Sequence, residues 1–116
     1  MKKLLYLLIV LSYLSCEAIF IQDISSSPVL ILAPTEGSSV SSGNISFRWK
    51  PVEEVSSYNI QIASPNFQNA NQVLTDSITL ENLYQRSLDA GEYQWRVKGI
   101  NSEYETDYTT VSFTVN

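Results

Sequence analysis

The sequence has no histidine and a single cysteine, Cys16. Without histidine, Ser-His-Asp catalysis, Cys-His catalysis and histidine-ligated zinc are all excluded. One cysteine excludes a four-cysteine zinc site and any disulfide within the chain. Basic residues are also few, with 7 Lys and Arg against 12 Asp and Glu. Because nucleic-acid binding depends on clustered lysine and arginine, this balance argues against a nucleic-acid partner.

The longest apolar run, residues 4–14, has eleven positions and is broken only by Ser12. A membrane-spanning helix needs about 20 residues, so this run is too short to cross a bilayer. It follows the cationic start Met1-Lys2-Lys3, and residues 1–15 are therefore predicted to be a signal peptide. Its removal leaves 5 basic and 12 acidic residues, a net charge of −7. The remaining hundred or so residues suit a single domain with one modest core.

Cys16 follows the apolar run directly, after the small residue Ser15. A lone cysteine in this position resembles the lipobox of bacterial lipoproteins, in which the thiol takes a diacylglyceryl group and the new amine is acylated. Tyr13 departs from that pattern, because a small aliphatic residue is usual three positions before the cysteine. The resemblance implies a lipid anchor on Cys16, and two or more acyl chains hold a protein stably on a membrane. The alternative is an ordinary signal peptide that is cut near Ser15 and leaves a free thiol.

Residues 16–27 are predicted to be the lipidated cysteine and a tether. The segment ends in three serines before Pro28, a composition that favours a loose linker. It also contains more apolar side chains than a spacer needs: Ile19, Phe20, Ile21 and Ile24. These could cover an edge of the domain, touch the membrane interface or meet a partner, and the sequence leaves the three roles open.

From residue 28 to residue 116 the sequence alternates between apolar and polar positions, with no helical period. Strands are expected at 29–33, 45–50, 58–63, about 72–78, 79–88, 92–98 and 110–115, with turns at 35–44 and 64–71. Some seven short strands predict an all-β protein, a single antiparallel β-sandwich. The alternation places six aromatic residues in its core: Phe47, Trp49, Tyr58, Tyr93, Trp95 and Phe113.

Several of these residues together resemble the fibronectin type III-like domain, over nearly all of 28–116. The carriers are Pro34, Phe47-x-Trp49, Tyr58-x-Ile60 and the string Leu-Asp-Ala-Gly-Glu-Tyr-Gln-Trp-Arg-Val at 88–97. That string, with residues 23–25 and 101–108, is especially similar to the versions found in lipoproteins of the Bacteroidetes. The resemblance implies an immunoglobulin-like fold, a tight turn at Gly91 and a tyrosine corner at Tyr93. In such a corner the tyrosine hydroxyl bonds back to the backbone, here near Leu88.

Carboxylates are the only plentiful reactive groups. A glycosidase needs two of them about 5–10 Å apart across a cleft, one with a raised pKa. A small sandwich offers little concavity, so Glu53 and Glu54, like the other acids, are interpreted as solvated loop residues and no enzyme is predicted.

The alternating Glu103, Glu105 and Asp107 are also candidate calcium ligands, together with Asn101. The same spacing describes an ordinary solvated strand face, and no cofactor or metal is predicted.

Four aromatic residues lie outside the expected core: Phe67, Tyr84, Tyr104 and Tyr108. Exposed rings of this kind stack on sugars or anchor a protein partner. Alternatively, Tyr104 and Tyr108 serve only to hold the last hairpin together. Separately, Asp-Ser-Ile at 76–78 resembles the acceptor for protein O-glycosylation in Bacteroidetes, which implies a glycan on Ser77.

These observations predict a non-catalytic, lipid-anchored binding or scaffold module of a Gram-negative envelope. The resemblance implies a small accessory subunit of an outer-membrane assembly, on the periplasmic or cell-surface face, with an envelope protein or a polysaccharide as partner. The alternative is a carbohydrate-binding surface lipoprotein, which would display Phe67, Tyr84, Tyr104 or Tyr108 exposed in one plane. An enzyme would instead need a buried carboxylate pair in a cleft.

Overall fold

The computed structural model describes residues 20–116, so the predicted signal peptide and Cys16 lie outside the described residues. The described part folds into eight strands: β1 (Ile31–Ala33), β2 (Ser38–Val40), β3 (Gly43–Trp49), β4 (Ser57–Ser64), β5 (Gln72–Thr79), β6 (Leu83–Leu88), β7 (Gly91–Ile100) and β8 (Thr109–Val115). Over this range the chain forms no helix that is long and apolar enough to cross a bilayer.

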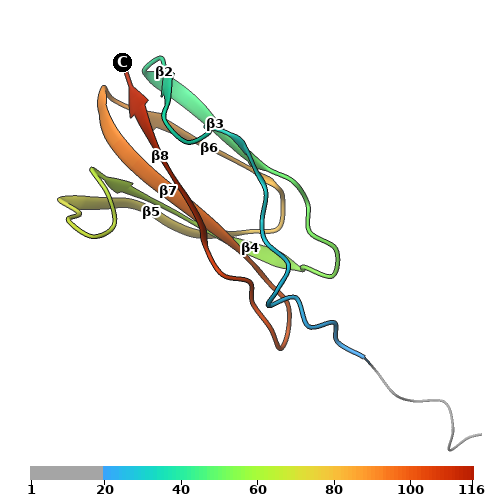
Figure 1. Cartoon of the computed structure of the whole chain (residues 1–116). Helices are drawn as coiled ribbons and strands as arrows, with labels where there is room; N and C mark the ends of the chain where they lie inside the picture. Colours follow the sequence, from blue (N-terminus) through green and yellow to red (C-terminus); the bar gives the residue numbers. More distant parts are fainter. Residues whose placement is uncertain (1–19) are drawn as a thin grey trace, which may run out of the picture.

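The strands form two sheets that pack face to face (Figure 1). One sheet has three strands in the order β1-β3-β6, and the other has five in the order β2-β8-β7-β4-β5. Neighbouring strands pair antiparallel except β2 and β8, which run parallel. The predicted all-β sandwich is therefore confirmed, with one parallel pair that the prediction did not include.

That parallel pair lies in the segment 35–44, which was predicted to be a turn. The Asn116 amide donates to the Val40 carbonyl at 2.8 Å, and the Gly37 amide donates to the Ser112 carbonyl at 2.8 Å. The strand thus forms because β8 lies beside it. Its three residues, Ser-Ser-Val, are too few to show an alternating pattern, so the turn prediction is wrong here.

The strand predicted at 79–88 is also shorter than expected. β5 continues to Thr79, and β6 begins only at Leu83 in the other sheet. The intervening residues form the turn by which the chain changes sheets, and the Asn82 side chain fixes it by donating to the Trp49 carbonyl at 2.9 Å. A change of sheet requires a break in the extended backbone, which the apolar pattern did not reveal.

The core between the sheets contains all six aromatic residues predicted for it, each 7% exposed or less. Their rings meet mostly edge to face: the Phe47 and Trp95 centroids are 5.1 Å apart, and those of Trp49 and Tyr58 are 5.4 Å apart. This geometry brings the positive edge of one ring to the negative face of the next. The predicted core is confirmed.

The polar atoms of these aromatic residues tie the core to nearby loops. The Tyr93 hydroxyl donates to the Asp89 carbonyl at 2.8 Å, the back-bond expected of a tyrosine corner. The Tyr93 ring lies over Gly91, where an added Cβ would stand 3.5 Å from it. The Trp95 indole donates to the Pro34 carbonyl at 3.1 Å and so joins β7 to the residue after β1.

The segment before β1 belongs to the folded unit. Ile24 and Val29 are each 1% exposed. The Thr109 hydroxyl donates to the Val29 carbonyl at 2.8 Å, and the Asn101 side chain donates to the Gln22 carbonyl at 2.9 Å. Part of the segment predicted to be a linker is therefore packed, and Ile24 takes the first of the three roles left open, covering an edge of the domain.

The two buried tryptophans give a matched comparison. Within residues 20–116 the Trp49 indole nitrogen is buried and has no hydrogen-bond partner. Trp95→Phe leaves the Pro34 carbonyl unpaired, whereas Trp49→Phe removes an unpaired donor. We expect Trp95→Phe to lower the free energy of unfolding by about 1–2 kcal/mol more than Trp49→Phe. Urea unfolding of the two variants measures the difference, and equal losses would contradict it.

Candidate functional site

The outer face of the five-stranded sheet is built by the residues of β7 that alternate with the core side chains. Trp95 and Val97 point inward and are fully buried. Arg96 and Lys98 alternate with them and therefore project from the opposite face of the sheet. The sequence thus places two cations side by side on the outside of the sandwich.

The Arg96 guanidinium lies between two aromatic rings. Its central carbon is 4.1 Å from the Phe67 ring centroid and 4.3 Å from that of Tyr108. The Lys98 ammonium lies 4.8 Å from the same Tyr108 ring. Each such contact contributes about 0.5–2 kcal/mol, depending on how far water is excluded. We call Phe67, Arg96, Tyr108 and Lys98 the aromatic–cation ladder.

The ladder holds the β4–β5 loop against the sheet. The Phe67 amide donates to the Gln94 side chain at 3.0 Å, which fixes the loop backbone above β7. The Arg96 Nε donates to the Gln61 side chain on β4 at 2.7 Å. The rings of Phe67 and Tyr108 both contact the Arg96 guanidinium, and both residues are only partly exposed.

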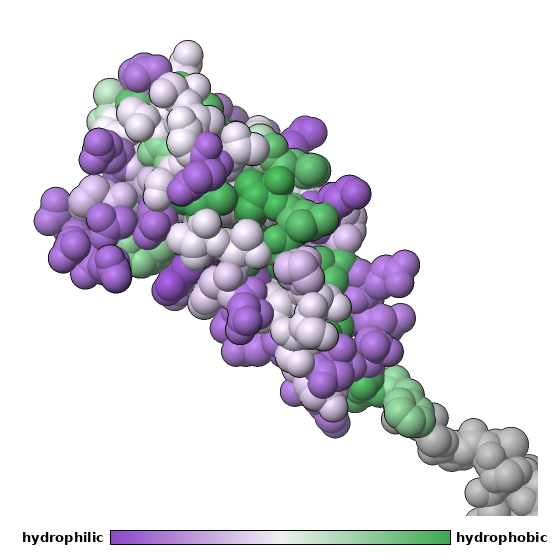
Figure 2. Space-filling model, in the orientation of Figure 1, coloured by the Kyte–Doolittle hydropathy of each residue, from purple (hydrophilic) through white to green (hydrophobic). Residues whose placement is uncertain are grey.

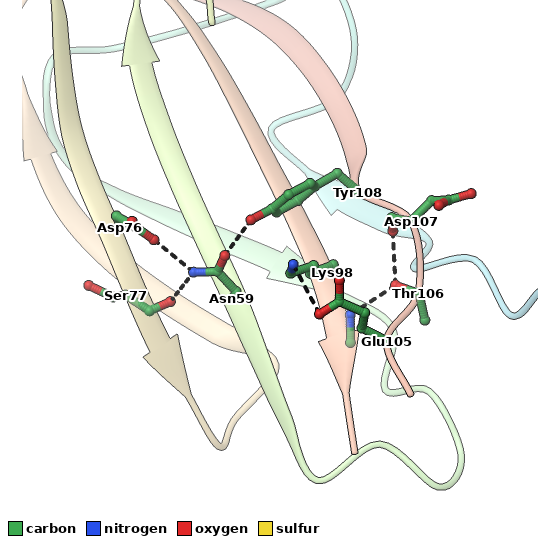
Figure 3. Close-up of polar contacts among 9 residues, drawn as sticks. Asn59, Asp76, Ser77, Lys98, Glu105, Thr106, Asp107 and Tyr108 are labelled. Carbon is green, nitrogen blue, oxygen red and sulfur yellow. Dashed lines mark hydrogen bonds and ion pairs between the residues drawn. The ribbon is translucent and has the colours of Figure 1, made fainter. Parts of the chain in front are cut away.

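Asn59 connects three segments beside the ladder (Figure 3). Its amide nitrogen donates to the Asp76 carboxylate at 2.9 Å and to the Ser77 carbonyl at 3.1 Å. Its amide oxygen accepts a hydrogen bond from the Tyr108 hydroxyl. The side chain is 8% exposed, and these bonds satisfy both its donors and its acceptor.

The environment of Asp76 favours its charged form. Hydrogen bonds from Asn59 and Gln61 lower the pKa of its carboxyl below the ordinary 3.8, more than burial raises it, and the charges of Arg96 and Lys98 add to the lowering. A catalytic general acid needs the opposite, a carboxyl that keeps its proton near neutral pH. Asp76 is therefore an ionised structural acceptor.

The alternating acids of the β7–β8 loop do not converge. Glu105 forms an ion pair with Lys98 at 3.2 Å (Figure 3). Among residues 20–116 no three His, Cys, Asp or Glu side chains come close enough to hold a metal ion. The candidate calcium ligands Glu103, Glu105 and Asp107 are thus not brought together.

Asn101, the fourth candidate calcium ligand, ties the loop together. Its side-chain oxygen accepts the backbone amides of Glu103 and Tyr104 at 3.1 and 2.8 Å. Its side-chain nitrogen donates to the carbonyls of Gln22 and Glu54 at 2.9 and 3.2 Å. One side chain thus joins three segments at one end of the sandwich, and its oxygen is already in use.

Sequence reasoning missed the role of Gly99 at this end. Its amide donates to the Thr106 hydroxyl at 3.0 Å, and its carbonyl accepts the Thr106 amide at 2.9 Å. A Cβ on Gly99 would lie only 2.8 Å from a methyl group of Val55. The β3–β4 loop can pack here only because residue 99 has no side chain.

The four aromatic residues predicted for ligand contact do not share one plane. Phe67 and Tyr108 meet on Arg96, as described above. Tyr84 lies on β6 in the other sheet and packs partly against the core. Tyr104 lies in the β7–β8 loop and is 36% exposed. The arrangement expected of a flat sugar-binding platform is absent from these four residues.

Ser77 lies in the middle of β5, opposite Ile60, and is partly buried. Its position is thus inside a paired strand, and a glycan there stays a prediction.

The aromatic–cation ladder was missed because Phe67 comes from a loop and β7 supplies only the cations. The alternation of β7 predicted an outward-facing Arg96, but not the rings on either side of it.

No family model matches the sequence, and no curated protein matches it either. Several solved structures, however, match the fold of this chain. The fibronectin(III)-like modules of Clostridium thermocellum CbhA align with a TM-score of 0.55 at 13% identity, over 76% of this chain and 95% of that one. The domain FN3tt aligns with a TM-score of 0.54 at 14% identity, over 76% of this chain and 95% of that one. The fibronectin type III domain of human KIAA0970 aligns with a TM-score of 0.55 at 14% identity, over 77% of this chain and 73% of that one. The chain therefore has a fibronectin type III-like fold, and at these identities the likeness shows the fold alone.

The hydrogen bonds to Asp76 predict a pH-dependent stability. A carboxyl whose pKa is lower in the folded than in the unfolded protein stabilises the fold above the unfolded pKa of 3.8. That contribution is lost as the pH falls through the folded pKa. We expect wild type to be more stable than Asp76→Asn at neutral pH, and this gap to narrow as the pH is lowered below 3.8. Urea unfolding at neutral and at acidic pH tests this, and a gap that stays constant between the two would contradict it.

Gly99→Ala should lower the free energy of unfolding by about 1–3 kcal/mol, because the new methyl group overlaps Val55. Val55→Ala in the same chain should restore part of that loss, since it removes the overlapping atoms. The double variant should therefore be more stable than the sum of the two single losses predicts. Strictly additive losses would show that the close approach is not what excludes a side chain at position 99.

Proposed function

We propose that this chain is a non-catalytic, lipid-anchored binding or scaffold module of the bacterial cell envelope, held on the outer membrane through Cys16. In this proposal it acts as a small accessory subunit of an outer-membrane assembly. The observation that carries its non-catalytic part is where the aromatic rings and the acids lie. The core uses most of the large aromatic side chains, while the acids of the β7–β8 loop stay apart at the surface.

The position of the N-terminal segment supports this reading. The chain enters the sandwich at the end formed by the β7–β8 loop, and its C-terminus lies at the opposite end (Figure 1). Asn101 fixes the entering segment there by its bond to the Gln22 carbonyl. An anchor upstream of Phe20 would therefore hold the sandwich by one end and leave the outer faces of both sheets accessible to a partner.

Carbohydrate binding receives less support. A sugar ring stacks on the open face of an aromatic ring, and in this fold Phe67 and Tyr108 each present a face to Arg96. Tyr84 is in the other sheet. A protein partner is therefore the first candidate, and a polysaccharide the second.

The experiment compares wild type with Cys16→Ser. We expect wild type to incorporate radiolabelled palmitate, to sediment with membranes and to co-purify with a stoichiometric envelope protein. Cys16→Ser should lose all three properties, because the only thiol that can be lipidated is gone. A matched control, Cys16→Ser with Ser26→Cys, restores a thiol at an exposed position and should remain unlabelled.

Labelled protein that co-purifies with no envelope protein would contradict the scaffold role, and a glycan array probed with the Cys16→Ser protein would then test the carbohydrate alternative. Unlabelled wild type would contradict the lipid anchor.

A further inference from the structure

The outer face of the three-stranded sheet carries a strip of exposed leucines. Leu30 and Leu32, at β1, are 54% and 51% exposed, and Leu80 in the β5–β6 turn is 80% exposed. Leu83, the first residue of β6, is partly exposed. Four of the six leucines in residues 20–116 thus lie on this side of the molecule. Figure 2 shows hydrophobic side chains across the middle of the face over which the β1 segment runs. We call Leu30, Leu32, Leu80 and Leu83 the leucine strip.

Part of the strip is hollowed. Leu83 and Asn82 line two neighbouring hollows. One hollow is completed by Leu32 and Arg48, and the other has Leu80 in its wall. Asn82 is fixed by its bond to the Trp49 carbonyl, so the ridge between the hollows is held in place.

Two exposed cations accompany the strip. Arg48 is paired with Leu83 across β3 and β6, and the Lys50 amide donates to the Leu30 carbonyl at 2.8 Å. Neither side chain forms an ion pair with any residue from 20 to 116; the ion pair found in this range joins Lys98 and Glu105. Residues 20–116 contain five basic and eleven acidic residues, so two of the five cations stand on this one face. One acid, Glu81, lines a hollow but pairs with neither cation.

We infer that this face binds an apolar segment of a partner protein that carries carboxylates. The leucine strip would take its apolar side chains, and the guanidinium of Arg48 can hold a carboxylate through two parallel hydrogen bonds. The inference rests on the proposed binding-module function and names the surface and the chemistry of the partner.

Two other occupants fit the charges less well. In a symmetric pair of copies the same patch meets itself, which would bring Arg48 and Lys50 of one copy toward those of the other. An anionic lipid surface would repel the described domain as a whole, because its five basic and eleven acidic residues give a net charge of −6. An acidic, apolar protein segment avoids the first objection, and because it is small it can place its carboxylates on Arg48 and Lys50 without facing the acids of the rest of the domain.

The test places a photoreactive benzoylphenylalanine at Leu32 or at Leu80 in the full-length, membrane-anchored protein. Matched control positions are Val73 and Ile78 on the five-stranded sheet, which are 55% and 63% exposed. After irradiation of intact cells, mass spectrometry identifies each cross-linked product and the residues joined. We expect a protein adduct from the leucine positions, joined to a segment with acidic and apolar residues, at a yield at least tenfold above the controls.

The double variant Arg48→Gln, Lys50→Gln should lower that yield at least tenfold, while Lys98→Gln on the opposite sheet should leave it unchanged. Lipid adducts at the leucine positions would overturn the inference in favour of a membrane contact, and adducts to a second copy would overturn it in favour of self-association. Protein adducts from Val73 or Ile78 alone would overturn the inference but leave the proposed function standing. No adduct at any of the four positions, with no Cys16-dependent partner, would contradict both.

Discussion

The alternation of β7 is the constraint on which the rest of the structure depends. Every second residue of this strand fills the core, and the residues between them build the outer face. Since β7 pairs with both β4 and β8, it fixes the register of the whole five-stranded sheet. A slip by one residue would place the guanidinium of Arg96 in the core and expose Trp95. The core and the aromatic–cation ladder are therefore two results of one register.

The two ends of the sandwich are organised differently. At the entry end, Asn101 and Gly99 join the N-terminal segment, the β3–β4 loop and the β7–β8 loop through side-chain hydrogen bonds and close packing. At the other end, β2 pairs with β8, and the C-terminal residue Asn116 takes part through its backbone. The entry end thus depends on a few particular side chains, whereas the far end combines backbone pairing with the tyrosine corner of Tyr93.

The sequence alone predicted the sandwich and its aromatic core, because period-two alternation is a local property that reports directly which side chains face inward. It also placed the tyrosine corner, whose partner lies only four residues from Tyr93. It missed β2, whose pairing partner is over seventy residues away in the chain. For the same reason it found Phe67 and Tyr108 as isolated candidates but not the Arg96 that unites them. Gly99 was missed because its requirement comes from Val55, which no local pattern connects to it.

The packing of the N-terminal segment has a consequence for reach. If the anchor is on Cys16 and the fold holds the chain from Gln22 onward, five residues, 17–21, separate the two. A fully extended chain advances at most about 3.3–3.6 Å per residue, so the entry end of the sandwich could rise no more than about 20 Å above the acyl chains. With an anchor on Cys16, so short a connection would keep the entry end of the sandwich near the lipid headgroups, and a partner that binds at this end would be met close to the bilayer surface.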